Sequence, residues 1–198
     1  KLYWSLLACL LCGTAVGQDF AKGTVYVDEN GNGRQDRKEA GLKGVSVSNG
    51  REVVLTDKNG KYKLPVQNDN IIFVIKPSGY ALPLDQNNLP KFYYIHKPQG
   101  SPELKYAGVA PTGPLPKAID FGLKKQEEPN TFSAFVFGDP QAYTVEELAY
   151  FKNGVINEIS DKTIAKFGIS LGDLVGDDLS LQPKYKSVIS TMGLPWYN

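Results

Sequence analysis

Residues 131–141, TFSAFVFGDPQ, and residues 165–178, AKFGISLGDLVGDD, share one design, in which an apolar run stops abruptly at glycine and aspartate. Each run reads as a buried strand followed by an acidic loop. Parallel strands joined by a helix bring their carboxyl ends to one edge of a sheet, where ligands bind in open α/β folds. We therefore expect Asp139 and Asp173 to lie close together and to favour a divalent cation between them.

The segment between these two runs reads as a helix. Thr144 and Glu147 have the spacing of an N-cap residue and its capping-box partner. Apolar residues then recur at helical spacing and should pack on the sheet; they are Leu148, Phe151, Val155, Ile156 and Ile159. A second short helix is expected over residues 185–192, followed by the start of another strand.

Composition leaves the class of protein open. The chain has 198 residues, a net charge of +1 and 22% charged residues, so it has no nucleic-acid-binding signature and has room for one or two domains.

Residues 1–17 contain an apolar run that ends in small residues, which is typical of a signal peptide cleaved before Gln18. The sequence around Cys9 resembles a lipoprotein box only faintly. We expect export to the periplasm or the extracellular space, with no transmembrane span in the mature chain.

Residues 18–125 have the pattern of an all-β sandwich of immunoglobulin-like type. Short apolar stretches alternate with Asn-Gly and Lys-Gly turns. Residues expected to face the core at period two are Val45, Val47, Val53, Leu55, Tyr62, Leu64 and Val66. The run IIFVIKP, residues 71–77, reads as a fully buried strand, and residues 92–108 are expected to line a surface facing the catalytic cleft. The one histidine, His96, fits a strand or core position better than a metal ligand.

One loop in this region has the spacing of a calcium-binding EF-hand loop, with glycine at its sixth position. The oxygen donors would be the Arg34 carbonyl and the side chains of Asp28, Asn30, Asn32, Asp36 and Glu39. A strand precedes the loop where an EF-hand has a helix. The alternative is an Asn-Gly turn whose polar side chains hydrogen-bond their own backbone.

Two resemblances follow from these motifs. FGDPQ at residues 137–141 and GDLVGDD at residues 172–178 resemble the first two signature blocks of the calcineurin-like metallophosphoesterases. The pattern of residues 23–64 resembles the B-type repeats of bacterial adhesins and carboxypeptidase-regulatory-like modules. It also resembles the domain that precedes the catalytic domain in a secreted branch of those phosphoesterases. The resemblance implies a sandwich domain at 18–125, a linker at 126–130 and the start of an α/β metallophosphoesterase sandwich at 131–198.

The phosphoesterase resemblance also implies a site. It would hold two divalent ions of the Mn, Fe, Zn or Mg class, with Asp139 and Gln141 on one ion and Asp173 bridging both. Gln141 stands where the family more often has histidine, which leaves the metal identity open. Asp177 and Asp178 would support these ligands or face a phosphoester substrate. No third signature block follows, so we expect a fragment that ends inside the catalytic domain and is inactive alone.

Two other functions fit parts of the sequence. The first is a calcium-stabilised module for cell-surface adhesion or carbohydrate binding. The second, weaker one is a receiver domain, in which acid-ended strands also hold Mg²⁺; an exported chain argues against it.

Overall fold

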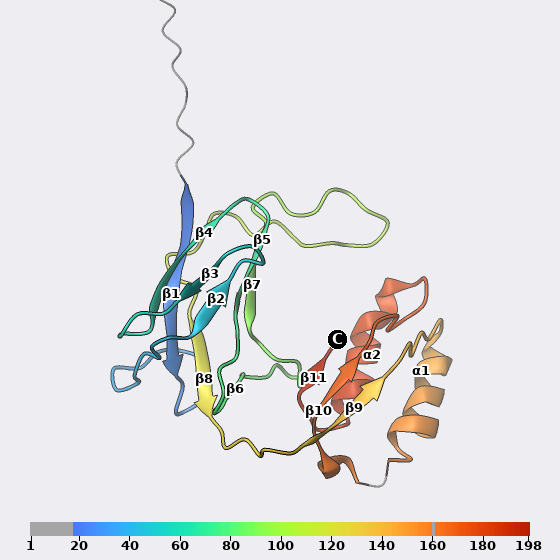
Figure 1. Ribbon diagram of the computed structural model, residues 1–198. Coiled ribbons are helices and arrows are strands. Elements are labelled where there is room, and N and C mark those ends of the chain that lie inside the picture. Colours follow the sequence, from blue (N-terminus) through green and yellow to red (C-terminus); the bar gives the residue numbers. More distant parts are fainter. Residues whose placement is uncertain (1–17, 160) are drawn as a thin grey trace, which may run out of the picture.

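A computed structural model of the chain describes residues 18–159 and 161–198 (Figure 1). The predicted signal peptide, residues 1–17, lies outside these described residues. The described part is mostly β-structure and contains three sheets and two short α-helices. None of its helices has the length and apolar character needed to cross a membrane.

The N-terminal region, residues 18–125, forms two four-stranded sheets that share one apolar core. The first sheet has the order β4-β1-β8-β6; β1 pairs antiparallel with β4 and parallel with β8. The second has the order β3-β2-β5-β7 and is antiparallel throughout. The strands are β1 (Asp19–Val27), β2 (Ser46–Ser48), β3 (Val53–Leu55), β4 (Lys61–Val66), β5 (Asn70–Val74), β6 (Tyr80–Ala81), β7 (Tyr93–His96) and β8 (Phe121–Lys125).

Strand β4 confirms the predicted alternation, because Tyr62, Leu64 and Val66 are all buried. The prediction for β3 was wrong. Val53 and Leu55 are 58% and 65% exposed, and the residue between them packs against the core. In a strand a shift of one residue exchanges the two faces, and all three residues of β3 are apolar, so their pattern does not select a face.

Strand β5 also differs from its prediction. Ile72 and Val74 are buried, but Ile71 and Ile75 on either side are about half exposed. The run is apolar on both faces, yet its antiparallel sheet covers the core with only one of them. A continuous apolar run therefore did not indicate a strand buried on both faces.

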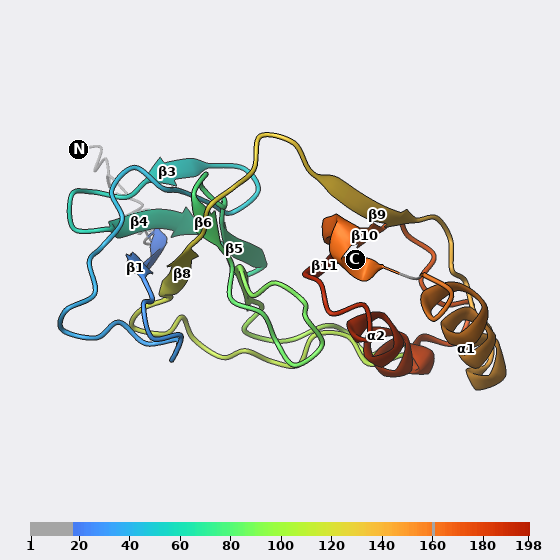
Figure 2. The same cartoon turned by 90° about the horizontal axis from the view of Figure 1, so that it is seen from below.

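The C-terminal region, residues 131–198, contains a three-stranded parallel sheet with the order β11-β10-β9. The helices lie on one face of it, and the two regions of the chain lie side by side (Figure 2). The predicted order of strand, helix and strand is confirmed. The elements are β9 (Ser133–Phe137), α1 (Val145–Phe151), a π-helical segment η1 (Lys152–Ile156), the short 3-10 turns η2 (Lys162–Ile164) and η3 (Leu179–Leu181), β10 (Ala165–Ser170), α2 (Gln182–Ser190) and β11 (Trp196–Tyr197).

Helix α1 begins as predicted. The Thr144 hydroxyl accepts a hydrogen bond from the Glu147 amide at 3.1 Å, while the Glu147 carboxylate accepts one from the Tyr143 amide at 2.5 Å. The carboxylate thus reaches one residue further back than in the usual capping box. After Phe151 the chain becomes π-helical, which changes the directions in which the predicted sheet-facing apolar residues point. Val155 is consequently 41% exposed, although it was expected to face the sheet.

The predicted linker, residues 126–130, is tied back to the N-terminal region. Glu128 forms an ion pair with Lys76 and accepts a hydrogen bond from the Ser78 hydroxyl at 2.8 Å. The hydrogen bond from Lys76 lowers the pKa of Glu128 to about 2. Each contact joins two exposed groups, so it orients the linker more than it stabilises the fold.

His96 is a buried residue of strand β7, only 3% exposed. Its Nδ1 has no hydrogen-bond partner among the described residues. Burial lowers the pKa of His96 below its ordinary value of 6.5, and the negative charge of Asp19 opposes this shift. In the pH range between this lowered pKa and about 6.5, the folded protein therefore binds fewer protons at His96 than the unfolded chain does.

We predict that the free energy of unfolding decreases as the pH falls from 7.5 through 6.5 to 5.5, partly because His96 must become charged on unfolding. In His96→Leu this decrease should be smaller, since the remaining carboxylates titrate equally in both proteins. Denaturant unfolding at the three pH values measures the difference. Equal losses of stability in the two proteins would contradict the prediction.

Candidate functional site

The two acidic loops predicted from the sequence leave the same edge of the parallel sheet. Strands β9 and β10 are neighbours, and their last residues, Phe137 and Ser170, pair directly. Asp139 follows the end of one strand and Asp173 the end of the other. The structure thus brings together the two residues that sequence reasoning placed together.

The backbone pairing continues beyond the strands. The Gln141 amide donates to the Asp173 carbonyl at 2.8 Å, and the Gly176 amide donates to the Ala142 carbonyl at the same distance. A further parallel bridge joins Ala142 to Val175. Main-chain hydrogen bonds therefore hold the two loops side by side, independently of their side chains.

All three predicted metal ligands have left-handed backbone conformations. Their φ angles are 42° for Asp139, 37° for Gln141 and 39° for Asp173. Among the described residues only one other non-glycine residue, Asn88, has a positive φ. Such conformations cost of order 1–3 kcal/mol each and cluster at functional sites. The side chains are exposed, so the conformations are not imposed by packing around them.

The donor atoms at this edge are carboxylate and amide oxygens, which suit a hard divalent ion such as Mg²⁺ or Mn²⁺. Two carboxylates and one amide form an incomplete set for two ions. Within residues 18–159 and 161–198, no group of three or more His, Cys, Asp or Glu side chains is arranged to hold a metal. The residues present fit part of a metal site.

Asp177 and Asp178 differ in what they contact. The Asp178 carboxylate accepts the Ser180 amide at 2.9 Å and caps η3, and hydrogen bonding from Ser180 lowers the pKa of Asp178. Its carboxylate thus has a local structural role. The carbonyl of Asp177 accepts a hydrogen bond from the Tyr106 hydroxyl, which belongs to the N-terminal region.

A loop of the N-terminal region therefore reaches the second acidic loop through Tyr106; that residues 92–108 face a catalytic cleft stays a prediction. The Lys105 amino group lies 4.9 Å from the centre of the Tyr106 ring. The positive charge of Lys105 adds a smaller contribution to the lowered pKa of Asp178. The loop thus brings a cation and a phenol to the side of the acidic loops.

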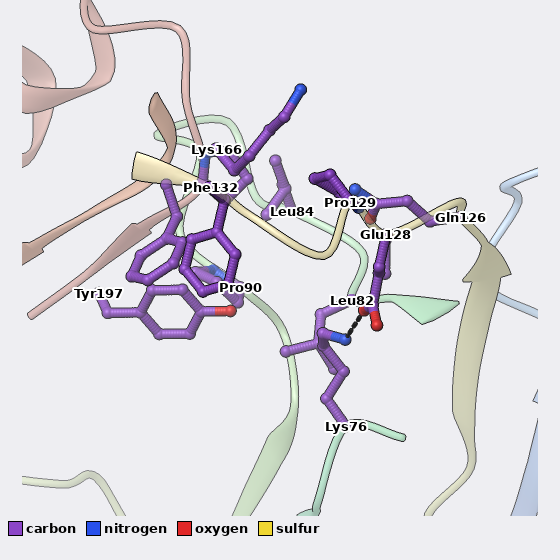
Figure 3. A pocket seen from close by; sticks show the side chains of 13 residues that line it. Lys76, Leu82, Leu84, Pro90, Gln126, Glu128, Pro129, Phe132, Lys166 and Tyr197 are labelled. Atoms are coloured by element: carbon purple, nitrogen blue, oxygen red, sulfur yellow. Dashed lines mark hydrogen bonds and ion pairs between the residues drawn. The ribbon is translucent and has the colours of Figure 1, made fainter. Parts of the chain in front are cut away.

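Two hollows lie between the regions. One of about 310 Å³ is lined by Phe132, Lys166 and Tyr197 and has the Lys76–Glu128 pair beside it (Figure 3). Because Phe132 and Lys166 lie at the amino ends of β9 and β10, this hollow is remote from the acidic loops. A second of about 670 Å³ includes Leu174, the residue after Asp173, but none of Asp139, Gln141 and Asp173 lines it.

The predicted calcium loop closes on itself. Asp28 is 2% exposed and accepts three backbone amides, those of Gly31, Asn32 and Gly33, at 2.7–3.1 Å. These contacts match the alternative of a self-capped turn.

The same loop also gathers the other predicted donors. Asp36 accepts from the side-chain amides of Asn30 and Asn32 at 2.6 and 3.0 Å. Burial, followed by the negative charges of Asp28 and Glu39, raises the pKa of the nearby Tyr26 to about 12. The loop therefore concentrates oxygen atoms and negative charge in one place.

Comparison with known proteins adds one relationship. Residues 29–107 match the family model described as the N terminal of calcineurin-like phosphoesterase. A search of curated proteins found no match. The matched residues lie within the N-terminal region and make up 79 of the 198 residues (107 − 29 + 1), so they do not include Asp139, Gln141 or Asp173. The match supports a metallophosphoesterase at the level of family.

Proposed function

We propose that the chain is part of an exported metal-dependent phosphoester hydrolase. The proposed division is a signal peptide at 1–17, an immunoglobulin-like sandwich domain at 18–125, a linker at 126–130 and the first part of an α/β phosphoesterase domain at 131–198. The family match supports the activity. The calcium-stabilised adhesion module remains the alternative.

One observation carries the proposal. Asp139, Gln141 and Asp173 lie at one sheet edge and all adopt left-handed conformations, and a backbone hydrogen bond joins Gln141 to Asp173. Asp139 and Gln141 would hold one divalent ion through oxygen, and Asp173 would bridge it to a second. Ions held by these oxygens would supply Lewis-acid activation of water and neutralisation of phosphate oxygens. The protein would contribute the side-chain oxygens of Asp139, Gln141 and Asp173, which the two hydrogen-bonded loops hold near one another.

We predict that Asp173→Asn lowers hydrolysis by the natural gene product containing this chain. Loss of even an outer partner of a bound metal commonly costs about 10–100-fold, so loss of a bridging carboxylate should cost at least about 100-fold. The assay uses a generic phosphate monoester and a generic diester with Mn²⁺, before and after chelation. A parallel Mn²⁺ titration followed by electron paramagnetic resonance reports binding separately from activity.

The matched control is Asp161→Asn. Asp161 is an exposed acid that caps η2 at the opposite end of β10. Its replacement should leave hydrolysis and Mn²⁺ binding unchanged. Activity that survives chelation, or that survives Asp173→Asn, would refute the proposed site and leave the adhesion module as the better reading.

We further propose that the loop from Asp28 to Glu39 binds calcium. Rotation of the Asn30 and Asn32 amides would turn their oxygens toward Asp36, since the amide nitrogens now face that carboxylate. Calcium sites of extracellular modules have dissociation constants of about 10⁻⁴–10⁻³ M.

At 10 mM calcium such a site would raise the melting temperature by roughly 3–10 °C. In Asp36→Asn the response should disappear. The control is Asp57→Asn, because Asp57 caps a similar Asn-Gly turn through the Asn59 and Lys61 amides but lacks the other oxygen donors. If calcium does not change the melting temperature of the unaltered protein, the loop is only a self-capped turn.

Export is proposed from residues 1–17. It is supported by the position of β1, which begins at Asp19, directly after the expected cleavage site. The Gln18 side chain already contacts the Val66 carbonyl at 2.9 Å. We predict that protein purified from the producing cells begins at Gln18, as measured by mass spectrometry of the amino terminus. An uncleaved amino terminus would contradict this.

A further inference from the structure

The turn between β6 and β7 is a rigid tip that its own hydrogen bonds close. The backbone of Asp85 bonds to that of Leu89 at 2.9 Å, and the Asn88 amide donates to the Asp85 carbonyl at 3.1 Å. The Asp85 carboxylate also accepts the amides of Asn87 and Leu89 at 2.8 and 2.9 Å. The flanking residues Leu84 and Pro90 form a bridge. The tip, residues 85–89, is therefore a preformed element.

This tip bonds to the C-terminal region through Asn88. Its carbonyl accepts the Trp196 backbone amide at 3.0 Å, and its side-chain amide donates to the Ser190 carbonyl at 3.0 Å. Ser190 ends helix α2, and its carbonyl also accepts the Gly193 backbone amide at 3.1 Å, so Asn88 is its second donor. Next to it, Leu89 packs against the apolar core of the C-terminal region.

The contact continues to the candidate site through Trp196. Its indole donates to the Ser170 hydroxyl at 2.8 Å, and that hydroxyl also bonds to the Tyr185 hydroxyl at 2.6 Å. All three side chains are buried. The ring fits because Gly168 has no side chain; a Cβ there would come within 1.9 Å of it. Ser170 ends β10, three residues before Asp173.

We infer that residues 85–89 are a docking key that fixes the N-terminal region to the C-terminal region and braces the end of β10. Asn88 is its positioning residue. The key recognises two backbone groups, a carbonyl at a helix end and an amide of strand β11. The inference does not depend on hydrolysis.

Asparagine suits this position for two reasons. Asn88 has a φ of 61°, and asparagine tolerates the left-handed conformation better than most residues. It also carries the short amide donor that reaches Ser190. Glycine would keep the conformation and lose the donor, whereas alanine would lose the donor and strain the conformation.

The test is hydrogen exchange of single backbone amides by NMR in the complete chain. In Asn88→Ala the Trp196 amide should exchange roughly tenfold faster, as expected for loss of about one hydrogen bond between residues 85–89 and the C-terminal region. Asn88→Gly should give a smaller increase. The Leu171 amide, which bonds to the Phe137 carbonyl at the end of β10, should also exchange faster.

Two internal references make the result decisive. Asn87→Ala changes the neighbouring tip residue, whose side chain makes no hydrogen bond among the described residues, and should leave the Trp196 amide unchanged. The Val25 amide lies in the other core and should be unaffected in every variant. If Asn88→Ala does not fold, Asn88→Asp removes the donor and keeps the conformation. Unchanged exchange at Trp196, or equal acceleration at Trp196 and Val25, would overturn the inference.

Discussion

The parallel pairing of β9 with β10 is the constraint on which the candidate site depends. Their hydrogen-bond ladder does not stop where the strands stop, because the Gln141 amide and the Asp173 carbonyl continue it. The separation of the two acidic loops is therefore set by main-chain geometry. Exposed side chains such as Asp139 would otherwise have no fixed position, since little packs around them. Because main-chain hydrogen bonds set the separation of the two acidic loops, this separation does not depend on packing of the loop side chains.

Left-handed backbone marks both the candidate site and the docking key. Aspartate and asparagine adopt this conformation at moderate cost, so Asp139, Asp173 and Asn88 are unsurprising in it. Gln141 is a less favourable choice. Asparagine would relieve the strain and keep an amide, but its side chain is one methylene shorter.

Local signals in the sequence predicted some of these features and missed others for physical reasons. The cap at Thr144 and the strand–helix–strand order depend on neighbouring residues, and both were predicted correctly. The prediction of which β3 residues face the core was wrong, because three consecutive apolar residues show no alternation between apolar and polar positions. Asn88 was missed because its partners, Ser190 and Trp196, are about a hundred residues away along the chain. Its sequence, DQNNL, reads only as a turn.

The contacts between the regions also bear on the choice between the two proposed functions. The family match covers residues 29–107, whereas the acidic residues lie beyond 131. A fold alone does not establish a function, but the matched region is not free of the acidic one. Leu89 packs against the apolar core of the C-terminal region, and the Tyr106 hydroxyl donates a hydrogen bond to the loop that follows Asp173. An independent adhesion module would keep such loops available for a ligand. Here they are used within the chain, which favours a region built to support the acidic edge.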